Sequence, residues 1–344
     1  MGRRKAKNGF LQEMIDEYGE DILIRRYSEG VPVISTGAVS IDVSTGIGGI
    51  PLGRVSEIYG PEGGGKTTIC LEIARNAIEL GFKVLYIDTE NSLDFGYTSD
   101  ILGEDYDEEN FLVLQPKSGE VALKIAEAGI ETGYKVIMFD SIASLSPEKE
   151  LDDPFDKAHI ALSPRLTAKF LRRQINEIRK KEVAMIVTNQ VRANIGSYMG
   201  DLTTPAGYAL KHYTSLRIYM TRSKKIVEKE EEIGHFVKFV IKKNKLAKPF
   251  RTATTNIIYG EGINYYRDLI SFGSLLGVIK TRGSYYAFED DTIGLGMAKS
   301  AEALKENPEL LDKIISICYN VAGVKVPQKP QQTQEDLDEP KDEN

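Results

Sequence analysis

Residues 60–67 read Gly60-Pro61-Glu62-Gly63-Gly64-Gly65-Lys66-Thr67 and fit the pattern G-x-x-x-x-G-K-[ST]. A β-rich run ends at Tyr59, and a helical pattern continues from the loop to about Leu80. Glycine N–H groups in such a loop surround phosphate oxygens, the lysine reaches the β and γ phosphates, and the threonine hydroxyl ligates Mg²⁺. The segment therefore predicts a strand–helix junction that binds a nucleoside triphosphate. A glycine-rich turn without a ligand is the alternative.

Short β-rich runs alternate with helical patterns on both sides of this loop. The runs are Arg54–Tyr59, Val84–Asp88, Val136–Asp140, Met185–Thr188, Leu216–Thr221 and Phe236–Ile241. Such alternation is typical of a largely parallel sheet with helices on both faces. We therefore expect an α/β fold with the loop at one edge of the sheet.

Acidic residues end or follow two of the other predicted strands. Asp140 ends an apolar run and precedes Ser141, where its carboxylate could hold the magnesium shell. A further acid is needed to orient or deprotonate the attacking water, and Glu90 lies just past the carboxyl end of Val84–Asp88. Asp88 is the competitor for this role. Glu90 is preferred because a residue beyond the strand reaches the crevice more easily. Together these residues predict a nucleoside triphosphatase.

The composition excludes several other classes of protein. The chain has 344 residues, of which 41% are apolar and 28% charged. It contains no run of the ~20 apolar residues that a membrane span needs, and its basic start is not followed by the apolar stretch of a signal peptide. Two cysteines and three histidines predict neither a disulfide framework nor a metal-binding cluster. We expect a soluble cytoplasmic protein with no membrane partner.

Residues 1–32 are predicted to form an N-terminal arm. It is basic at its start and then carries apolar residues at helical spacing up to Gly19, namely Phe10, Leu11, Met14, Ile15 and Tyr18. Such an arm helix packs either on its own domain or on a neighbouring subunit, and the spacing leaves both open.

Residues 33–264 are predicted to form the core, and residues 265–326 a small α/β lobe. In this lobe Asn307-Pro308 marks a helix start, and an apolar face follows at Leu310, Leu311, Ile314, Ile315 and Cys318. Residues 327–344 are predicted to be a disordered acidic tail. Six acids and one lysine lie between Glu335 and Asn344, so −5 of the net charge of −7 belongs to this tail.

Further motifs are spread along the chain from the arm to about residue 320. They are Ile34-Ser35-Thr36-Gly37, Glu57-Ile58-Tyr59-Gly60-Pro61-Glu62, Ile87-Asp88-Thr89-Glu90, Asn189-Gln190-Val191-Arg192, Lys243-Asn244-Lys245 with Pro249-Phe250, Tyr259-Gly260-Glu261-Gly262-Ile263-Asn264, Ile293-Gly294 and Asn307-Pro308-Glu309. In this order and spacing they resemble the bacterial RecA family of DNA strand-exchange recombinases. The resemblance implies a RecA-type P-loop ATPase core with a mainly parallel central sheet, an N-terminal helical arm and a small α/β C-terminal lobe.

The resemblance also implies an ATP- and DNA-dependent recombinase. Its subunits would form a helical filament on single-stranded DNA, with ATP and Mg²⁺ between neighbours, and would pair that strand with homologous double-stranded DNA. ATP hydrolysis would drive filament turnover in DNA repair and recombination. The filament would also stimulate repressor self-cleavage in the SOS response to DNA damage and would contact loader proteins. A ring ATPase or helicase of the same fold, and a nucleotide-gated scaffold, are the alternatives.

The resemblance assigns roles to particular residues of the ATP site. Glu90 would be the general base, Gln190 would respond to the γ-phosphate, and Lys243 and Lys245 would reach a neighbour's γ-phosphate. Nucleotide contacts are implied for Gly60, Pro61, Glu62, Gly63, Gly64, Gly65, Lys66, Thr67, Thr68, Asp94, Tyr97, Asp140, Ser141 and Tyr259, with Thr67 and Asp140 also at the metal. Tyr97 would stack on adenine, and a core or surface tyrosine is the alternative.

Two loops would contact DNA, at about residues 151–165 and 192–211. The implied contacts are Ile160, Arg165, Arg172, Arg192, Ile195, Gly196, Gly207 and Lys211. Cations and backbone N–H groups bind phosphates without reading bases, so the binding would tolerate any base sequence. Ile160 and Ile195 would insert between bases or else anchor their loops.

The chain departs from the bacterial family pattern at several positions. Gly63 and Gly64 stand where two serines are usual, and Ala206-Gly207-Tyr208 replaces Gly-Gly-Asn in a second loop that is one residue shorter. His212 replaces an interface phenylalanine, which would make filament cooperativity respond to pH near ~6.5. Such departures are compatible with a divergent or phage-encoded member. The acidic tail would compete with DNA for the binding surface.

Overall fold

The computed structural model describes residues 13–17, 19, 30–103, 106–154, 162–193, 202–205, 207–228 and 230–327. The chain divides into two compact units, residues 1–31 and residues 32–344. In the first unit residues 13–17 are helical, and the Gly19 N–H donates to the Ile15 carbonyl at 2.7 Å. Met14 and Ile15 therefore lie on a helix as their spacing predicts, whereas Phe10, Leu11 and Tyr18 fall outside the described residues.

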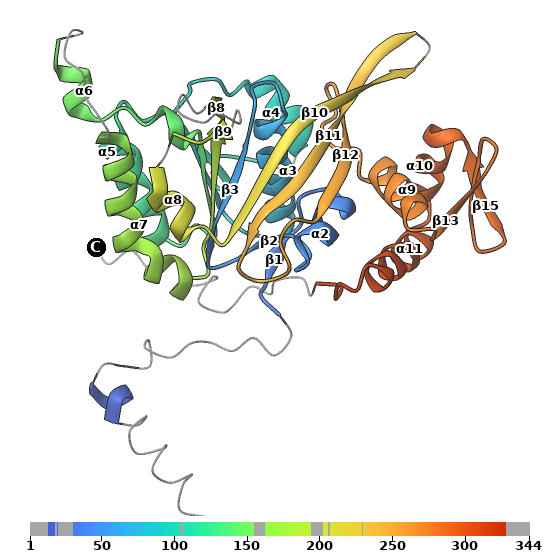
Figure 1. Cartoon of the computed structure of the whole chain (residues 1–344), viewed down its shortest axis with the longest axis horizontal. Helices are drawn as coiled ribbons and strands as arrows, with labels where there is room; N and C mark the ends of the chain where they lie inside the picture. Colours follow the sequence, from blue (N-terminus) through green and yellow to red (C-terminus); the bar gives the residue numbers. More distant parts are fainter. Residues whose placement is uncertain are drawn as a thin grey trace, which may run out of the picture. The chain divides into compact units, whose positions relative to one another are not determined.

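The second unit contains an eight-stranded sheet with the order β12-β11-β10-β3-β7-β6-β4-β5 (Figure 1). Its strands are β3 (Arg54–Gly60), β4 (Val84–Asp88), β5 (Phe111–Leu114), β6 (Val136–Asp140), β7 (Ala184–Gln190), β10 (Leu216–Glu228), β11 (Glu231–Asn244) and β12 (Thr252–Ile258). Strands β10, β3, β7, β6, β4 and β5 are parallel, whereas β11 is antiparallel to both of its neighbours. The expected mainly parallel sheet is confirmed.

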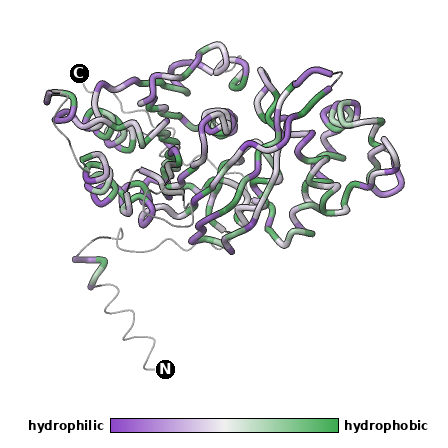
Figure 2. The backbone as a smooth tube through the Cα atoms, turned by 45° about the horizontal axis from the view of Figure 1, so that its top comes forward, coloured by the Kyte–Doolittle hydropathy of each residue, from purple (hydrophilic) through white to green (hydrophobic). Residues whose placement is uncertain are grey.

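Helices cover both faces of this sheet, and each face has its own apolar core. The first core receives α2 (Val39–Thr45), α3 (Lys66–Glu79) and α4 (Phe95–Leu102), and the second receives α5 (Gly119–Glu131), α7 (Leu162–Lys180) and α8 (Gly207–Tyr213). Strand β4 shows the alternation, because Val84 and Tyr86 belong to the first core whereas Leu85 and Ile87 belong to the second. Green and purple alternate along the helices because one side of each helix faces the sheet and the other faces solvent (Figure 2).

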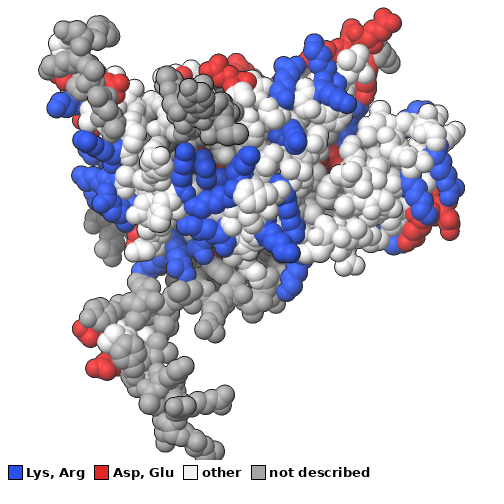
Figure 3. All heavy atoms as spheres, viewed as in Figure 1, with Lys and Arg blue, Asp and Glu red and all other residues white. Residues whose placement is uncertain are grey.

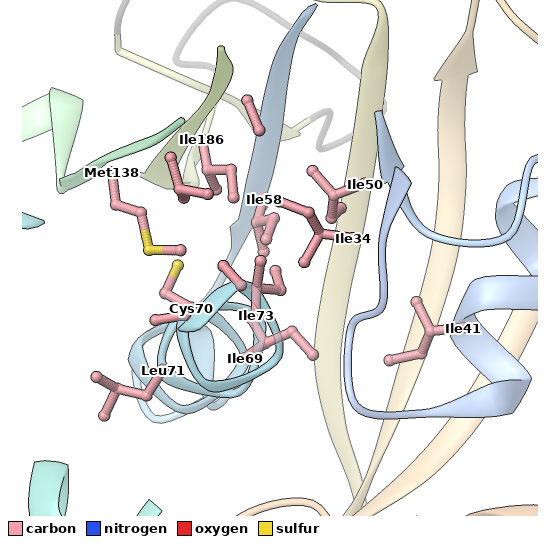
Figure 4. Close-up of a cluster of buried hydrophobic side chains, with 14 of the residues drawn as sticks. Ile34, Ile41, Ile50, Ile58, Ile69, Cys70, Leu71, Ile73, Met138 and Ile186 are labelled. Atoms are coloured by element: carbon pink, nitrogen blue, oxygen red, sulfur yellow. The ribbon is translucent and has the colours of Figure 1, made fainter. Parts of the chain in front are cut away.

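The first core holds the helix that follows the phosphate-binding loop against the sheet. Ile69, Cys70 and Ile73 of α3 lie beside Ile58 of β3 and Ile186 of β7 (Figure 4). All of these side chains are at most 1% exposed. Close packing of this kind fixes the start of α3, and therefore the loop before it, relative to the strand ends.

Short elements complete the core. They are β1 (Val33–Ile34), β2 (Ile50–Pro51), the 3₁₀ turn η2 (Ile142–Ser144), α6 (Glu148–Asp152), β8 (Arg192–Ala193) and β9 (Leu202–Thr203). Within the described part of the chain, no helix is long and apolar enough to cross a membrane.

The carboxyl ends of the central parallel strands meet at one edge of the sheet. The register pairs Gly60 with Gln190 and Asp88 with Asp140. The start of the phosphate-binding loop, the residues after β4 and the end of β6 are thereby brought to the same edge, where ligands bind in open α/β sheets.

Strands β5 and β12 are absent from the sequence prediction, and β10 and β11 extend beyond it. β5 has only four residues, and β12 carries threonines rather than an apolar run. β10 alternates buried and partly buried residues only as far as Thr221, beyond which its side chains are mostly exposed. β5 is therefore too short to be recognised as a strand, whereas β12 and the extension of β10 lack the apolar pattern by which strands are recognised.

The C-terminal lobe has three antiparallel strands and three helices. It contains α9 (Tyr265–Leu275), β13 (Ile279–Arg282), β14 (Tyr285–Phe288), β15 (Asp291–Leu295), α10 (Gly296–Glu306) and α11 (Pro308–Val321). Asn307 caps α11 as predicted, because its side chain accepts the Leu310 N–H at 3.1 Å. Asp268 of α9 joins the lobe to α2, since it accepts the Ser40 N–H at 2.9 Å and the Ser40 hydroxyl at 2.6 Å. The predicted acidic tail beyond Pro327 lies outside the described residues.

Candidate nucleotide and DNA site

The P-loop, residues 60–67, connects β3 to α3. Gly63 and Gly65 have φ of +64° and +85°, values that side-chain-bearing residues rarely adopt. A Cβ at Gly65 would also overlap the Ile257 side chain. Lys66 Nζ donates to the Pro61 carbonyl at 2.9 Å. The loop therefore presents its N–H groups at a helix N-terminus, which is an arrangement that suits phosphate.

Thr67 and Asp140 meet at the start of α3. The Thr67 hydroxyl donates to Asp140 Oδ2 at 2.7 Å, and Asp140 also accepts the Tyr86 hydroxyl at 2.6 Å and the Thr188 hydroxyl at 2.5 Å. Asp140 is 4% exposed, so these three hydroxyls are what stabilise its buried carboxylate. A hydroxyl and a carboxylate side by side are the hard oxygen ligands that Mg²⁺ prefers, so the two residues fit the metal of a nucleotide complex.

Glu90 and Asp88 lie two residues apart but in different surroundings. Glu90 Oε1 accepts the Ser141 hydroxyl at 2.5 Å and the Gln190 side-chain amide at 3.2 Å. Asp88 is buried and accepts the backbone N–H groups of Glu90 and Leu93. Glu90 therefore faces the ends of β6 and β7, while Asp88 organises the turn after β4.

A cleft of about 630 Å³ joins these groups. The predicted residues that line it are Glu62, Gly63, Gly64, Gly65, Lys66, Thr67, Thr68, Glu90, Tyr97, Asp140, Gln190 and Tyr259. The Tyr97 hydroxyl is 2.7 Å from Thr68 Oγ1, which places the tyrosine against the first turn of α3.

Several predicted nucleotide residues lie outside the lining of this cleft. Gly60 and Pro61 accept hydrogen bonds from the Lys66 ammonium through their carbonyls. Ser141 is linked to the cleft through Glu90, which accepts its hydroxyl. Asp94 is the N-cap of α4 and accepts the Tyr97 N–H at 2.7 Å, so it orients the helix that carries Tyr97.

His235, Ile257 and Gly260 line the cleft but are missing from the sequence prediction. His235 lies on β11 directly opposite Ile257 of β12. The missing signal was β12 itself, because a strand that is not recognised cannot be placed beside the P-loop. One sequence feature could have pointed to His235: it continues the alternating apolar row formed by Val237, Phe239 and Ile241.

Lys243 and Lys245 do not line the cleft of their own chain. Lys243 Nζ donates to the Lys211 carbonyl at 2.5 Å, and Lys245 Nζ donates to the His212 carbonyl at 2.9 Å. Both lysines therefore bind the carbonyl end of α8. Burial lowers the pKa of Lys243, and the charges of Lys245 and Arg217 lower it further.

The cations predicted to contact DNA gather on α7 and α8. The exposed residues of α7 include Arg165, Lys169, Arg172, Arg173, Arg179 and Lys180. Figure 3 shows Lys and Arg side chains clustered over this side of the molecule. Tyr208 of α8 is 90% exposed, with Lys211 Nζ 5.7 Å from its ring centre. The surface combines positive charge with an aromatic face, as nucleic-acid sites do.

The predicted second DNA loop is wrong at its carboxyl end. Gly207 and Lys211 lie on α8, because Leu210 packs into the second core and fixes this segment as a helix. The first predicted loop is likewise bounded by α6 and by the start of α7 at Leu162. Arg192 begins β8, and its side chain is not among the parts that the structure describes. Ile160, Ile195 and Gly196 also lie outside the described residues.

Comparison with known proteins identifies the family. A family model described as the RecA N-terminal domain matches residues 5–264, and one described as the RecA C-terminal domain matches residues 267–317. Protein RecA of Pseudarthrobacter chlorophenolicus is 37% identical, with 98% of this chain and 96% of the relative covered. Protein RecA of Laribacter hongkongensis is 36% identical, with coverage of 99% and 98%. The chain belongs to the RecA family of DNA-dependent ATPases, which act in DNA recombination and repair.

Proposed function

We propose that the chain binds ATP and Mg²⁺ in the P-loop cleft, assembles on single-stranded DNA in the cytoplasm and promotes homologous pairing and strand exchange. The observation that carries this proposal is the meeting of Glu90, Gln190 and the P-loop in one cleft. A carboxylate there can take a proton from water, and Gln190 ends the strand that leads into the second DNA segment. Nucleotide state and DNA contact would thus be linked through β7.

The P-loop N–H groups and Lys66 would hold the phosphates, while Thr67 and Asp140 would hold Mg²⁺. The metal supplies charge neutralisation at the phosphates. Asp140 is oriented by its three hydroxyl donors. Glu90 would act as the general base, with Ser141 and Gln190 fixing the orientation of its carboxylate.

The charges of the cleft support a site shared between subunits. Three acids, Glu62, Glu90 and Asp140, line it, whereas Lys66 is its one basic side chain apart from His235 among the described residues. A triphosphate needs further positive charge in the transition state. Lys243 and Lys245 do not line the cleft of their own chain, so we propose that they supply this charge to the cleft of a neighbouring subunit.

The single-stranded DNA would lie along α7 and α8. Arg165 and Arg172 are exposed on one side of α7, and Lys211 is on the adjoining α8. If the protein contacts only phosphates, it should bind DNA of any base sequence, and its affinity should fall as the salt concentration rises.

The test is ATP hydrolysis with and without single-stranded DNA, for the wild type and for Glu90→Gln. DNA should stimulate the wild type, and the variant should lose about 10²- to 10⁴-fold in turnover, as expected for removal of a general base. Extended helical filaments should persist by electron microscopy. Glu131→Gln, which changes an exposed acid of α5 outside the cleft, is the matched control and should retain turnover. DNA-independent turnover by closed rings would instead favour a ring ATPase.

Sharing of the site between subunits can be tested by mixing two inactive variants. Glu90→Gln keeps its lysines, and the double variant Lys243→Ala/Lys245→Ala keeps its cleft. In a randomly mixed filament about one quarter of the interfaces combine the two intact halves, so the mixture should regain about a quarter of wild-type turnover. Turnover that stays at the sum of the separate variants would contradict the sharing.

A further inference from the structure

His235 occupies an unusual place at the end of an apolar row. Val237, Phe239 and Ile241, at alternating positions of β11, are all buried in the core beneath α3. His235 is the next residue in this row, opposite Ile257 of β12, and it lines the nucleotide cleft. A polar ring therefore stands where the strand pattern favours an apolar side chain.

Both nitrogens of this ring are buried without a hydrogen bond. His235 is 5% exposed, and neither Nδ1 nor Nε2 has a partner within the part of the chain that the structure describes. An imidazole buried in this way destabilises the fold, because its N–H and its lone pair have both lost water. The arrangement is explained if a ligand of the cleft supplies the missing partner.

The charged groups around His235 favour the neutral ring. Burial lowers the pKa of His235, Arg222 of β10 lowers it further, and Glu232 of β11 acts in the opposite direction. Lys225 lies across from His235 on β10 and is paired with Glu232 at 2.5 Å. A neutral imidazole offers one donor and one acceptor, so it can match a hydroxyl or a heterocyclic nitrogen.

Tyr259 is placed to control access to this ring. Its ring centre is 5.7 Å from that of His235, and its hydroxyl bonds to Arg222 and Glu232 at 2.9 Å each. Tyr259 is 49% exposed and lines the same cleft, so it can move without disrupting the core. Such a movement would uncover the edge of the imidazole.

The sheet order places His235 away from Asp140, the residue that fits the metal. β11 is separated from β6, which carries Asp140, by three intervening strands. The two strands are therefore four strand spacings apart, and at about 4.8 Å per spacing the distance between β11 and β6 is about 19 Å. The P-loop lies between the two, so His235 is at the end of the cleft where the sugar and base of a bound nucleotide would lie.

We propose that His235 is a nucleotide-binding residue that hydrogen-bonds the nucleoside half of the ligand once the Tyr259 ring moves aside. This inference rests on the proposed nucleotide site. The contact would hold the nucleoside in place and thereby position the phosphates along the P-loop.

The test is calorimetric titration of wild type and His235→Phe with ADP and with inorganic tripolyphosphate. Phenylalanine keeps the ring but cannot form the bond, so ADP affinity should fall roughly threefold to tenfold while tripolyphosphate affinity stays unchanged. Thermal unfolding of the ligand-free variant should occur at a higher temperature, since two unpaired nitrogens are removed. His235→Gln should recover part of the ADP affinity, and His235→Leu, which also cannot form the bond, replaces the phenylalanine variant if that one fails to fold.

His212→Phe, which changes a histidine of α8 outside the cleft, is the matched control and should bind ADP as the wild type does. Equal ADP affinity in wild type and His235→Phe would overturn the inference, and so would an equal loss for ADP and tripolyphosphate. A wild type that binds neither ligand would overturn the nucleotide site itself. That outcome is distinguishable because it does not depend on His235.

Discussion

Glu72 is a buried carboxylate that links the P-loop helix to the far wall of the cleft. Its Oε1 accepts the Ile263 N–H at 2.6 Å, and its Oε2 pairs with Arg75 at 2.6 Å. Ile263 follows Tyr259 and Gly260, which line the cleft. Burial raises the pKa of Glu72 to about 7, although Arg75 and the Ile263 N–H act to lower it. We predict that this carboxyl makes the stability of the protein depend on pH.

Whether stability rises or falls with pH follows from the pKa of Glu72 in the folded and in the unfolded chain. Unfolded Glu72 has its ordinary pKa of 4.5, so between pH 4.5 and about 7 the folded protein keeps a proton that the unfolded chain has released. The contribution to stability is therefore complete below pH 4.5 and is lost as the pH rises through about 7. At about 1.4 kcal/mol per pH unit, the total loss is about 3 kcal/mol.

The perturbation is Glu72→Gln, which keeps an acceptor for the Ile263 N–H but does not titrate. Urea unfolding followed by circular dichroism suits a chain without tryptophan, and nucleotide is left out. From pH 5 to pH 8 the unfolding free energy of the variant should rise by about 2.5 kcal/mol relative to wild type. Glu131→Gln changes an exposed acid of α5 and is the control. Its unfolding free energy should change with pH as that of the wild type does. A difference between wild type and Glu72→Gln that stays constant with pH would refute the reasoning.

Three further changes test other parts of the structure. Gly65→Ala should lower ADP affinity at least about tenfold in a calorimetric titration, because φ is +85° and the new methyl group meets Ile257; unchanged affinity would contradict this. Asn307→Ala should destabilise α11 by about 1 kcal/mol in hydrogen exchange, since the cap to the Leu310 N–H is lost, and equal protection would show that the cap is dispensable. Removal of residues 328–344 should strengthen binding to duplex DNA, with a gain that shrinks as salt rises, whereas an unaltered Kd would exclude competition by the tail.

The fold was predictable wherever burial produces an apolar run. β4 and β6 have the predicted bounds, because both faces of these strands are covered and every side chain is apolar except the terminal aspartate. β5 escaped prediction because it has only four residues, and β12 because threonines and an asparagine interrupt its apolar residues. The extension of β10 is stabilised by pairing with β11 beyond the sheet, and backbone pairing leaves no trace in the side-chain pattern.

The candidate site was predictable where one local motif carries the chemistry. Thr67 is identified by the P-loop pattern and Asp140 by the end of an apolar strand, so each was found from its own local motif, and the sheet then brings the two into contact. Residues that depend on distant partners were not predictable. Asp94 is adjacent to the expected adenine position in sequence but serves as a helix cap, and His235 reaches the cleft only through its pairing with β12.

The different roles of Glu90 and Asp88 depend on hydrogen bonds rather than on their positions in the sequence. A carboxylate has about four lone-pair sites, and Asp88 receives four donors, from the N–H groups of Glu90, Ser92 and Leu93 and from the Gln115 side chain. Its capacity is filled, so it has no site left for water. Glu90 lines the cleft, and its side-chain hydrogen bonds within the described structure all go to Oε1 rather than to Oε2. A base that is oriented through one oxygen and open at the other can hold a water molecule and accept its proton, whereas Asp88 would first have to break the turn that it stabilises.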